Sequence, residues 1–201
     1  MLFDSLTNDE IVDSESALEF MKEATKLASS ADLEDLSERV SRKAECFQGH
    51  LSLSLVDKLD EGNFDGIVSL IFSIGRKSKR LIDANGFENL RNMIRELLYG
   101  DAPVEDRFSL FVNQVDGIEE KMRINFAGEL LHYSMPDRYW LWTNWIWDPD
   151  NNTGALPLVV QEEVDLLGET EGETYLRVGE AMSYVNQVGN ERGYSRVGHG
   201  K

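Results

Sequence analysis

The sequence predicts an all-α protein, a compact domain of about seven to nine helices. Three observations favour this fold class. Apolar residues recur at intervals of three or four along most of the chain, which is the spacing of one helix face. All four prolines lie at position 103 or later, so no proline interrupts the first half. No run of alternating apolar and polar residues is long enough to form a sheet.

The first half of the chain carries four apolar stripes, and each predicts one helix. These helices span about residues 17–28, 33–55, 64–74 and 87–98. Gly100 is expected to close the fourth, because glycine is common just beyond a helix C-terminus. Gly49 interrupts the longest stripe, which consists of Leu33, Leu36, Val40, Ala44, Phe47, Leu51 and Leu55.

The second half begins with two further helices, over 104–115 after Pro103 and over 118–133 after an Asp-Gly turn. Ser134 and Pro136 then predict another helix, with the serine as N-cap and the proline in the first turn. Residues 156–160 fit either a short strand or the start of a helix, and periodicity does not separate the two.

A last apolar stripe predicts a helix over 175–189. Beyond it glycines accumulate and the apolar periodicity ends. We therefore expect residues 1–190 to form a single helical domain and residues 191–201 to form a mobile C-terminal tail.

Charge and cysteine content restrict the classes of function. The chain has 37 acidic and 20 basic residues, a formal net charge of −17, which repels DNA and anionic membranes. The single cysteine, Cys46, excludes an internal disulfide framework. The N-terminus has no signal-peptide pattern and no apolar run could span a bilayer. We expect a cytoplasmic protein with no membrane contact and no cofactor.

The most unusual segment contains all four tryptophans of the chain within eight positions. Clustered aromatic side chains often anchor protein interfaces, so this segment is the predicted partner-binding surface. The alternative is a packed corner of the helical core, because large aromatic side chains also fill cores. The predicted partner-binding residues are Tyr139, Trp140, Trp142, Trp145 and Trp147.

A second unusual segment is a basic cluster in this acidic chain, formed by Arg76, Lys77, Lys79 and Arg80. Such a patch could bind a phosphate, an acidic protein segment or a nucleic-acid backbone. It is not a P-loop, because Leu70 stands where that motif needs its first glycine. A solvated helix face is the alternative interpretation.

Catalytic and metal-binding signals are weak. Glu129 and His132 lie one turn apart on a predicted helix, but a carboxylate-bridged metal site needs this motif twice. No nucleophile elbow occurs, and Cys46 lies beside an apolar stripe. We therefore predict no catalytic and no metal-binding residue.

These observations favour a non-enzymatic accessory or adaptor protein that docks on a protein partner with a basic surface. Its acidic residues would steer association, and its tryptophan-rich segment would make the contact. One alternative is a nucleic-acid-linked helical module, which binds DNA through the basic cluster or mimics its charge. Another is an enzyme that uses Glu129 and His132 beside an aromatic pocket. The oligomeric state and the substrate, if any, stay open.

Overall fold

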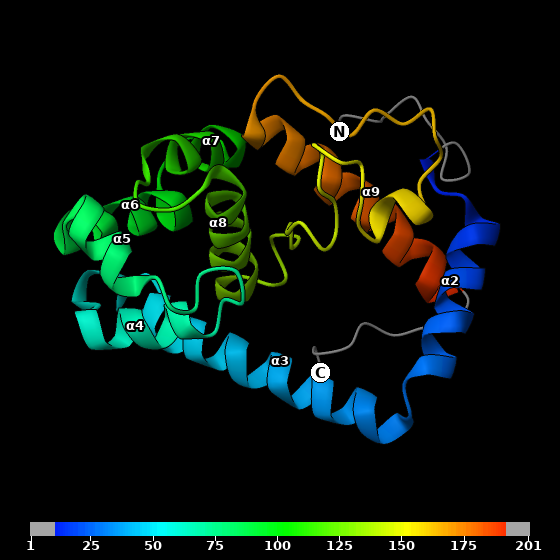
Figure 1. Ribbon diagram of the computed structural model, residues 1–201, viewed down its shortest axis with the longest axis horizontal. Coiled ribbons are helices and arrows are strands. Elements are labelled where there is room, and N and C mark those ends of the chain that lie inside the picture. Colours follow the sequence, from blue (N-terminus) through cyan, green and yellow to red (C-terminus); the bar gives the residue numbers. More distant parts are fainter. Residues whose placement is uncertain (1–10, 192–201) are drawn as a thin grey trace.

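The computed structural model describes residues 11–191 and confirms the all-helical class (Figure 1). This part of the chain contains eight α-helices and two short 3-10 helices, η1 and η2, and no β-sheet. The α-helices are α2 (Ser14–Leu27), α3 (Ser30–Leu51), α4 (Glu61–Ser69), α5 (Ser78–Asn85), α6 (Phe87–Tyr99), α7 (Val104–Gln114), α8 (Glu120–Ser134) and α9 (Glu171–Glu191).

The helices form two groups joined by the longest one. In Figure 1, α3 runs along one edge of the molecule, from α2 at one end to α4 at the other. Helices α4 to α8 gather at the α4 end, and α9 lies near α2 and extends back to α7. The most extensive helix pairings are α7 with α9 and α3 with α8.

Local signals explain how α3 begins and ends. Ser29 and Asp32 form a capping box, in which the Asp32 carboxylate accepts from the Ser29 backbone N–H at 2.9 Å. Gly49 lies inside the helix, which continues to Leu51. The helix ends four residues before the predicted end, because the chain turns at Ser52 and a 3-10 turn, η1 (Val56–Lys58), buries Val56.

The helix predicted to start at Ser134 does not form, because Ser134 is the last residue of α8. The backbone after it is bound to α8 side chains instead. Nδ1 of His132 donates to the carbonyl oxygen of Tyr139 at 2.9 Å, and Asn125 accepts from the backbone N–H of Asn144 at 2.9 Å. These bonds hold an irregular segment against α8. A helix over the same residues would not place these backbone groups within reach of Asn125 and His132.

The possible strand at 156–160 is a 3-10 turn, η2 (Leu156–Leu158), followed by an isolated bridge between Val12 and Val160. Two backbone hydrogen bonds of 3.0 Å support this bridge, from Asp13 to Val159 and from Gln161 to Ile11. The predicted last helix is present as α9 and continues to Glu191. The predicted mobile tail otherwise lies outside the described residues.

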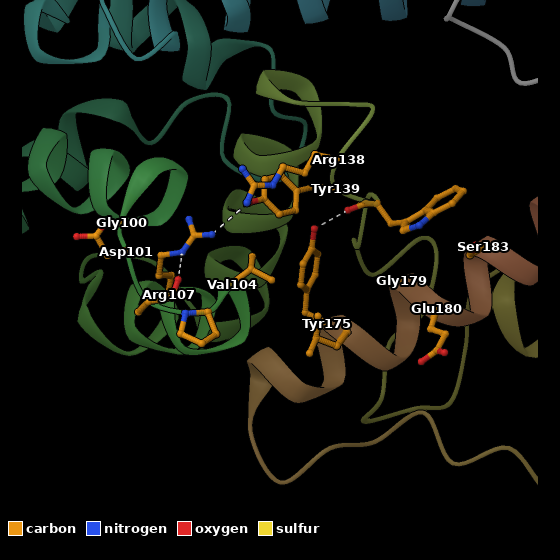
Figure 2. Close-up of a pocket in the computed structure, with 14 residues that line it drawn as sticks. Gly100, Asp101, Val104, Arg107, Arg138, Tyr139, Tyr175, Gly179, Glu180 and Ser183 are labelled. Atoms are coloured by element: carbon orange, nitrogen blue, oxygen red, sulfur yellow. Dashed lines mark hydrogen bonds between the residues drawn. The ribbon is translucent and has the colours of Figure 1, made fainter. Parts of the chain in front are cut away.

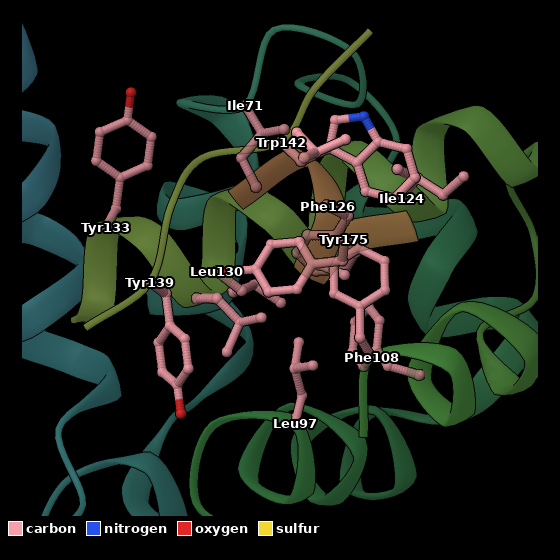
Figure 3. Close-up of a cluster of buried hydrophobic side chains, with 14 of the residues drawn as sticks. Ile71, Leu97, Phe108, Ile124, Phe126, Leu130, Tyr133, Tyr139, Trp142 and Tyr175 are labelled. Carbon is pink, nitrogen blue, oxygen red and sulfur yellow. The ribbon is translucent and has the colours of Figure 1, made fainter. Parts of the chain in front are cut away.

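The core is one continuous cluster of buried side chains, and aromatic rings form its centre (Figure 3). The ring of Phe108 on α7 stacks on Tyr175 of α9 at 4.5 Å between centroids and on Trp142 at 5.8 Å. Phe126 of α8 packs edge-on against Phe111 at 5.4 Å. Across residues 11–191, no helix has both the length and the apolar character needed to cross a bilayer.

Candidate functional site

The structure divides the tryptophan-rich segment between core and surface. Tyr139, Trp142 and Trp147 are buried, and Trp140 is half-buried. The two buried indoles also have internal acceptors: Trp142 donates to the carbonyl of Trp147, and Trp147 donates to the Asn152 side chain, each at 3.0 Å. Of the five predicted partner-binding residues, Trp145 and part of Trp140 are therefore accessible to solvent.

Trp145 is the member of the segment that faces solvent, with 74% of its surface exposed. It lies edge-on to Phe72, which is 86% exposed, with 6.5 Å between ring centroids. Phe72 belongs to the loop between α4 and α5, where Leu70 is also partly exposed. We call Phe72 and Trp145 the aromatic pair.

The basic cluster continues from the same loop into α5. Arg76, Lys79 and Arg80 are exposed, and Lys77 is half-buried. Lys79 forms an ion pair with Asp83 at 3.1 Å, one turn along the helix. The other three have no ion pair within residues 11–191. The cluster thus carries uncompensated positive charge close in sequence to Phe72.

The chain after Trp145 carries acidic residues, Asp148 and Asp150. Lys121 pairs with Asp148 at 2.9 Å and with Asp150 at 3.0 Å. Hydrogen bonds from Lys121 and Asn151 lower the pKa of Asp148. The hydrogen bonds that Lys121 donates to Asp148 and Asp150 raise the pKa of Lys121. The sequences that flank the aromatic pair are therefore polar and of mixed charge.

Glu129 and His132 are already engaged in structural contacts. Glu129 is buried and forms an ion pair with Lys43 of α3, whose ammonium also lies 4.4 Å from the ring centre of Tyr133. Burial raises the pKa of Glu129, and the charge of Lys43 opposes that shift. Burial, with a smaller contribution from Glu129, raises the pKa of Tyr133 to about 12. Among residues 11–191, no group of three His, Cys, Asp or Glu side chains could hold a metal ion.

A cleft of about 750 Å³ opens between the start of α7, the middle of α9 and the segment before Trp140 (Figure 2). Neither Glu129 nor His132 lines it. Arg107 and Tyr139 are buried residues of its wall, and Arg138 is exposed. Figure 2 shows these three side chains near one another, whereas Glu180 lies on α9 at the far side.

Arg107 is a buried charge, 4% exposed, that the sequence analysis did not single out. Its guanidinium donates to the carbonyl oxygens of Ala102, at 2.8 Å, and Leu97, and to the hydroxyl of Tyr139 at 3.1 Å. None of its partners within residues 11–191 is a carboxylate. An arginine on an amphipathic helix gives no sequence signal of such burial.

Two tyrosines connect this arginine to the rest of the cleft. The guanidinium of Arg138 lies 5.2 Å from the ring centre of Tyr139, so Tyr139 contacts one arginine through its hydroxyl and another through its ring. Tyr175 donates its hydroxyl to the carbonyl of Trp140 at 3.0 Å. Burial is the main cause that raises the pKa of Tyr175; the nearby Tyr139 adds to the shift and Arg107 opposes it.

Neither a protein-family model, a curated protein sequence nor a solved structure matches this chain.

Proposed function

We propose that this protein is a non-enzymatic accessory protein that docks on a protein partner through Phe72 and Trp145. One observation carries the proposal: two large aromatic rings, 86% and 74% exposed, lie against each other on the surface. Tryptophan is strongly enriched among the residues that dominate binding energy at interfaces. Burial of both rings by a partner would remove a large apolar area from water.

The flanking charges fit an interface centre with a polar rim. Arg76 and Lys77 follow Phe72 on its loop, and Asp148 and Asp150 follow Trp145. Interface cores of this kind are aromatic, and their rims are polar and accessible to water. The tryptophan-rich segment keeps its predicted docking role in this proposal, with Trp145 as the contacting residue and its buried members as the support.

The net charge of −17 supports a partner with a basic surface. Opposite net charges attract two proteins before they touch and so raise their association rate. Dissolved salt screens this attraction, so the association rate falls as the salt concentration rises. The single cysteine favours a reducing compartment, so we place the interaction in the cytoplasm.

The test compares affinity-tagged wild-type protein with Phe72→Ser and Trp145→Ser variants in the native host. Leu27→Ser is the matched control, because Leu27 is 87% exposed and lies on α2, away from the α4 loop in Figure 1. We expect a stoichiometric basic protein with wild type and with the control, and its loss from both aromatic variants. Titration with the purified partner should show about tenfold or greater weakening for Trp145→Ser.

Equal binding of that partner by wild type and both aromatic variants would contradict the docking role of the aromatic pair. If the captured partner were acidic and were lost only from the two aromatic variants, the docking surface would be supported. The prediction of a basic partner would then be wrong.

A nucleic-acid-linked function is the second candidate, favoured by the charges of Arg76, Lys77 and Arg80. They form no ion pair within residues 11–191 and lie close in sequence to the exposed Phe72. Basic grooves with exposed aromatic rings are typical of single-strand binding. This function predicts affinity for a fluorescent oligothymidine that falls steeply with salt and with charge reversal at these positions. An oligothymidine affinity unchanged by charge reversal would exclude direct binding through this cluster.

A further inference from the structure

We propose that the cleft between α7 and α9 binds a small organic carboxylate. Its carboxylate group would be held by Arg107, Arg138 and the hydroxyl of Tyr139. The site is separate from the aromatic pair, since neither Phe72 nor Trp145 lines the cleft. The inference therefore does not depend on the docking function.

The first support is the charge of Arg107. Burial of a guanidinium is costly unless an anion or several hydrogen bonds compensate it. Here the partners are two backbone carbonyls and a phenol, all neutral. The carbonyl of Leu97 belongs to the last turn of α6, where the helix dipole supplies only part of a negative charge. A bound anion would supply the rest.

The second support is the set of donors that remain. A guanidinium has five N–H groups, and the three hydrogen bonds of Arg107 use one each on Nε, Nη1 and Nη2. One N–H on each terminal nitrogen is left, and a guanidinium can donate from both terminal nitrogens to the two oxygens of a carboxylate. Tyr139 accepts from Arg107, so its own hydroxyl hydrogen is available to donate.

The third support is the position of Arg138. It lines the same cleft and packs on the ring of Tyr139, and its guanidinium has no hydrogen bond or ion pair within residues 11–191. Two guanidinium groups therefore flank Tyr139 at one part of the cleft wall. In a chain with a net charge of −17, such a local concentration of positive charge would favour an anion at this place.

The rest of the cleft indicates the class of anion. Its size, about 750 Å³, lies in the range of small-molecule sites. Val104, Leu176 and Trp140 give apolar wall, and Asp101 and Glu180 add acidic groups. The acidic groups disfavour a dianionic phosphate more than a singly charged carboxylate, and the apolar walls favour a ligand with an aliphatic or aromatic body.

The test uses benzoate as the probe, titrated by two-dimensional NMR at neutral pH and low salt. Benzamide has the same shape without the charge, and phenyl phosphate carries a second charge. We expect saturable benzoate binding with a dissociation constant on the order of 1 mM, since the probe has few atoms. Benzamide should bind about tenfold more weakly, because a hydrogen bond to a charged group is stronger.

Two variants test the location of the site and leave the buried charge of Arg107 in place. Arg138→Met and Tyr139→Phe should each weaken benzoate binding by roughly fivefold to tenfold. Arg95→Met is the matched control, because Arg95 is an exposed arginine of α6 that does not line the cleft, and it should leave binding unchanged.

Three outcomes would overturn the proposal. One is the absence of saturable benzoate binding up to about 20 mM, well above the affinity expected of so small a probe. Another is wild-type affinity for benzoate in both cleft variants. The hydrogen bonds of Arg107 would then serve only to connect α6 to α7. The third is tighter binding of phenyl phosphate than of benzoate, which would reject the carboxylate.

Discussion

The carbonyl oxygen of Trp142 lies against Gly128 so closely that a Cβ atom on this glycine would be only 2.2 Å from it. Gly128 is in the middle of α8, where alanine would otherwise be preferred. The absence of a side chain here lets the irregular segment that contains the tryptophans approach the helix backbone. This contact holds Trp142 beside Phe108 in the core.

We predict that Gly128→Ala destabilises the protein by about 2 kcal/mol, because overpacking outweighs the gain in helix propensity. Gly49→Ala in α3 is the control: apart from its own stretch of helix, no atom lies within 4 Å of its added Cβ, and stability should rise by up to about 1 kcal/mol. Urea unfolding of the two variants measures both effects. A stabilised Gly128→Ala variant would contradict the close approach.

Trp142 and Trp145 of the tryptophan-rich segment should differ sharply in their contribution to stability. We expect Trp142→Ala to cost about 3–5 kcal/mol, as large aromatic truncations in cores do. Trp145→Ser should change the free energy of unfolding by less than about 0.5 kcal/mol, because its ring is mostly in water. Similar losses in both variants would mean that Trp145 is also buried in the folded protein.

The ion pair between Lys43 and Glu129 predicts a non-additive double-mutant cycle. Glu129→Leu should cost about 3–5 kcal/mol, because it leaves the Lys43 ammonium without its counter-ion in a largely buried place. Lys43→Met combined with Glu129→Leu should restore most of that loss. Chemical unfolding of the four proteins gives the coupling energy, and additive losses would rule out a direct charge interaction.

The lowered pKa of Asp148 predicts part of the acid sensitivity of the protein. Between its folded pKa and its ordinary value of 3.8, the unfolded chain binds more protons than the folded one. The stability that Asp148 contributes is therefore complete above 3.8 and is lost as the pH falls through its folded pKa. We expect Asp148→Asn to be less stable than wild type near neutral pH.

In strong acid that difference should disappear, since the wild-type carboxyl is then neutral as well. Urea unfolding across this pH range checks the trend. Glu162→Gln serves as the control, because Glu162 is exposed and has no ion pair within residues 11–191. A difference between wild type and Asp148→Asn that stays constant with pH would assign the effect to packing.

The sequence predicts those parts of the fold that local patterns determine. The stripe and the glycine that predict α6 and its end at Gly100 are both confirmed. The turn before α8 is confirmed too, where Gly117 has a φ of 89° that other residues rarely adopt. In these places the helix propensity, the apolar period and the terminating residue all favour the same structure.

The segment after α8 could not be predicted in this way. Ser134 and Pro136 carry the local pattern of a helix start, but Asn125 and His132 bind the following backbone in an irregular path. These are contacts between elements, which no short window of sequence contains. The same limit applies to the cleft, since the burial of Arg107 depends on how α9 and the segment around Tyr139 meet α7.

The bridge between Val12 and Val160 has a consequence for the order of folding during synthesis. Residues 11–13 exchange backbone hydrogen bonds with positions 159–161, which are made almost 150 residues later. Helices α4 to α8 can pack on one another while the ribosome still holds the C-terminal part. Helix α2 contacts η2 and α9, so it cannot complete its packing until both have been made. We therefore expect residues 11–27 to be made early and to dock late.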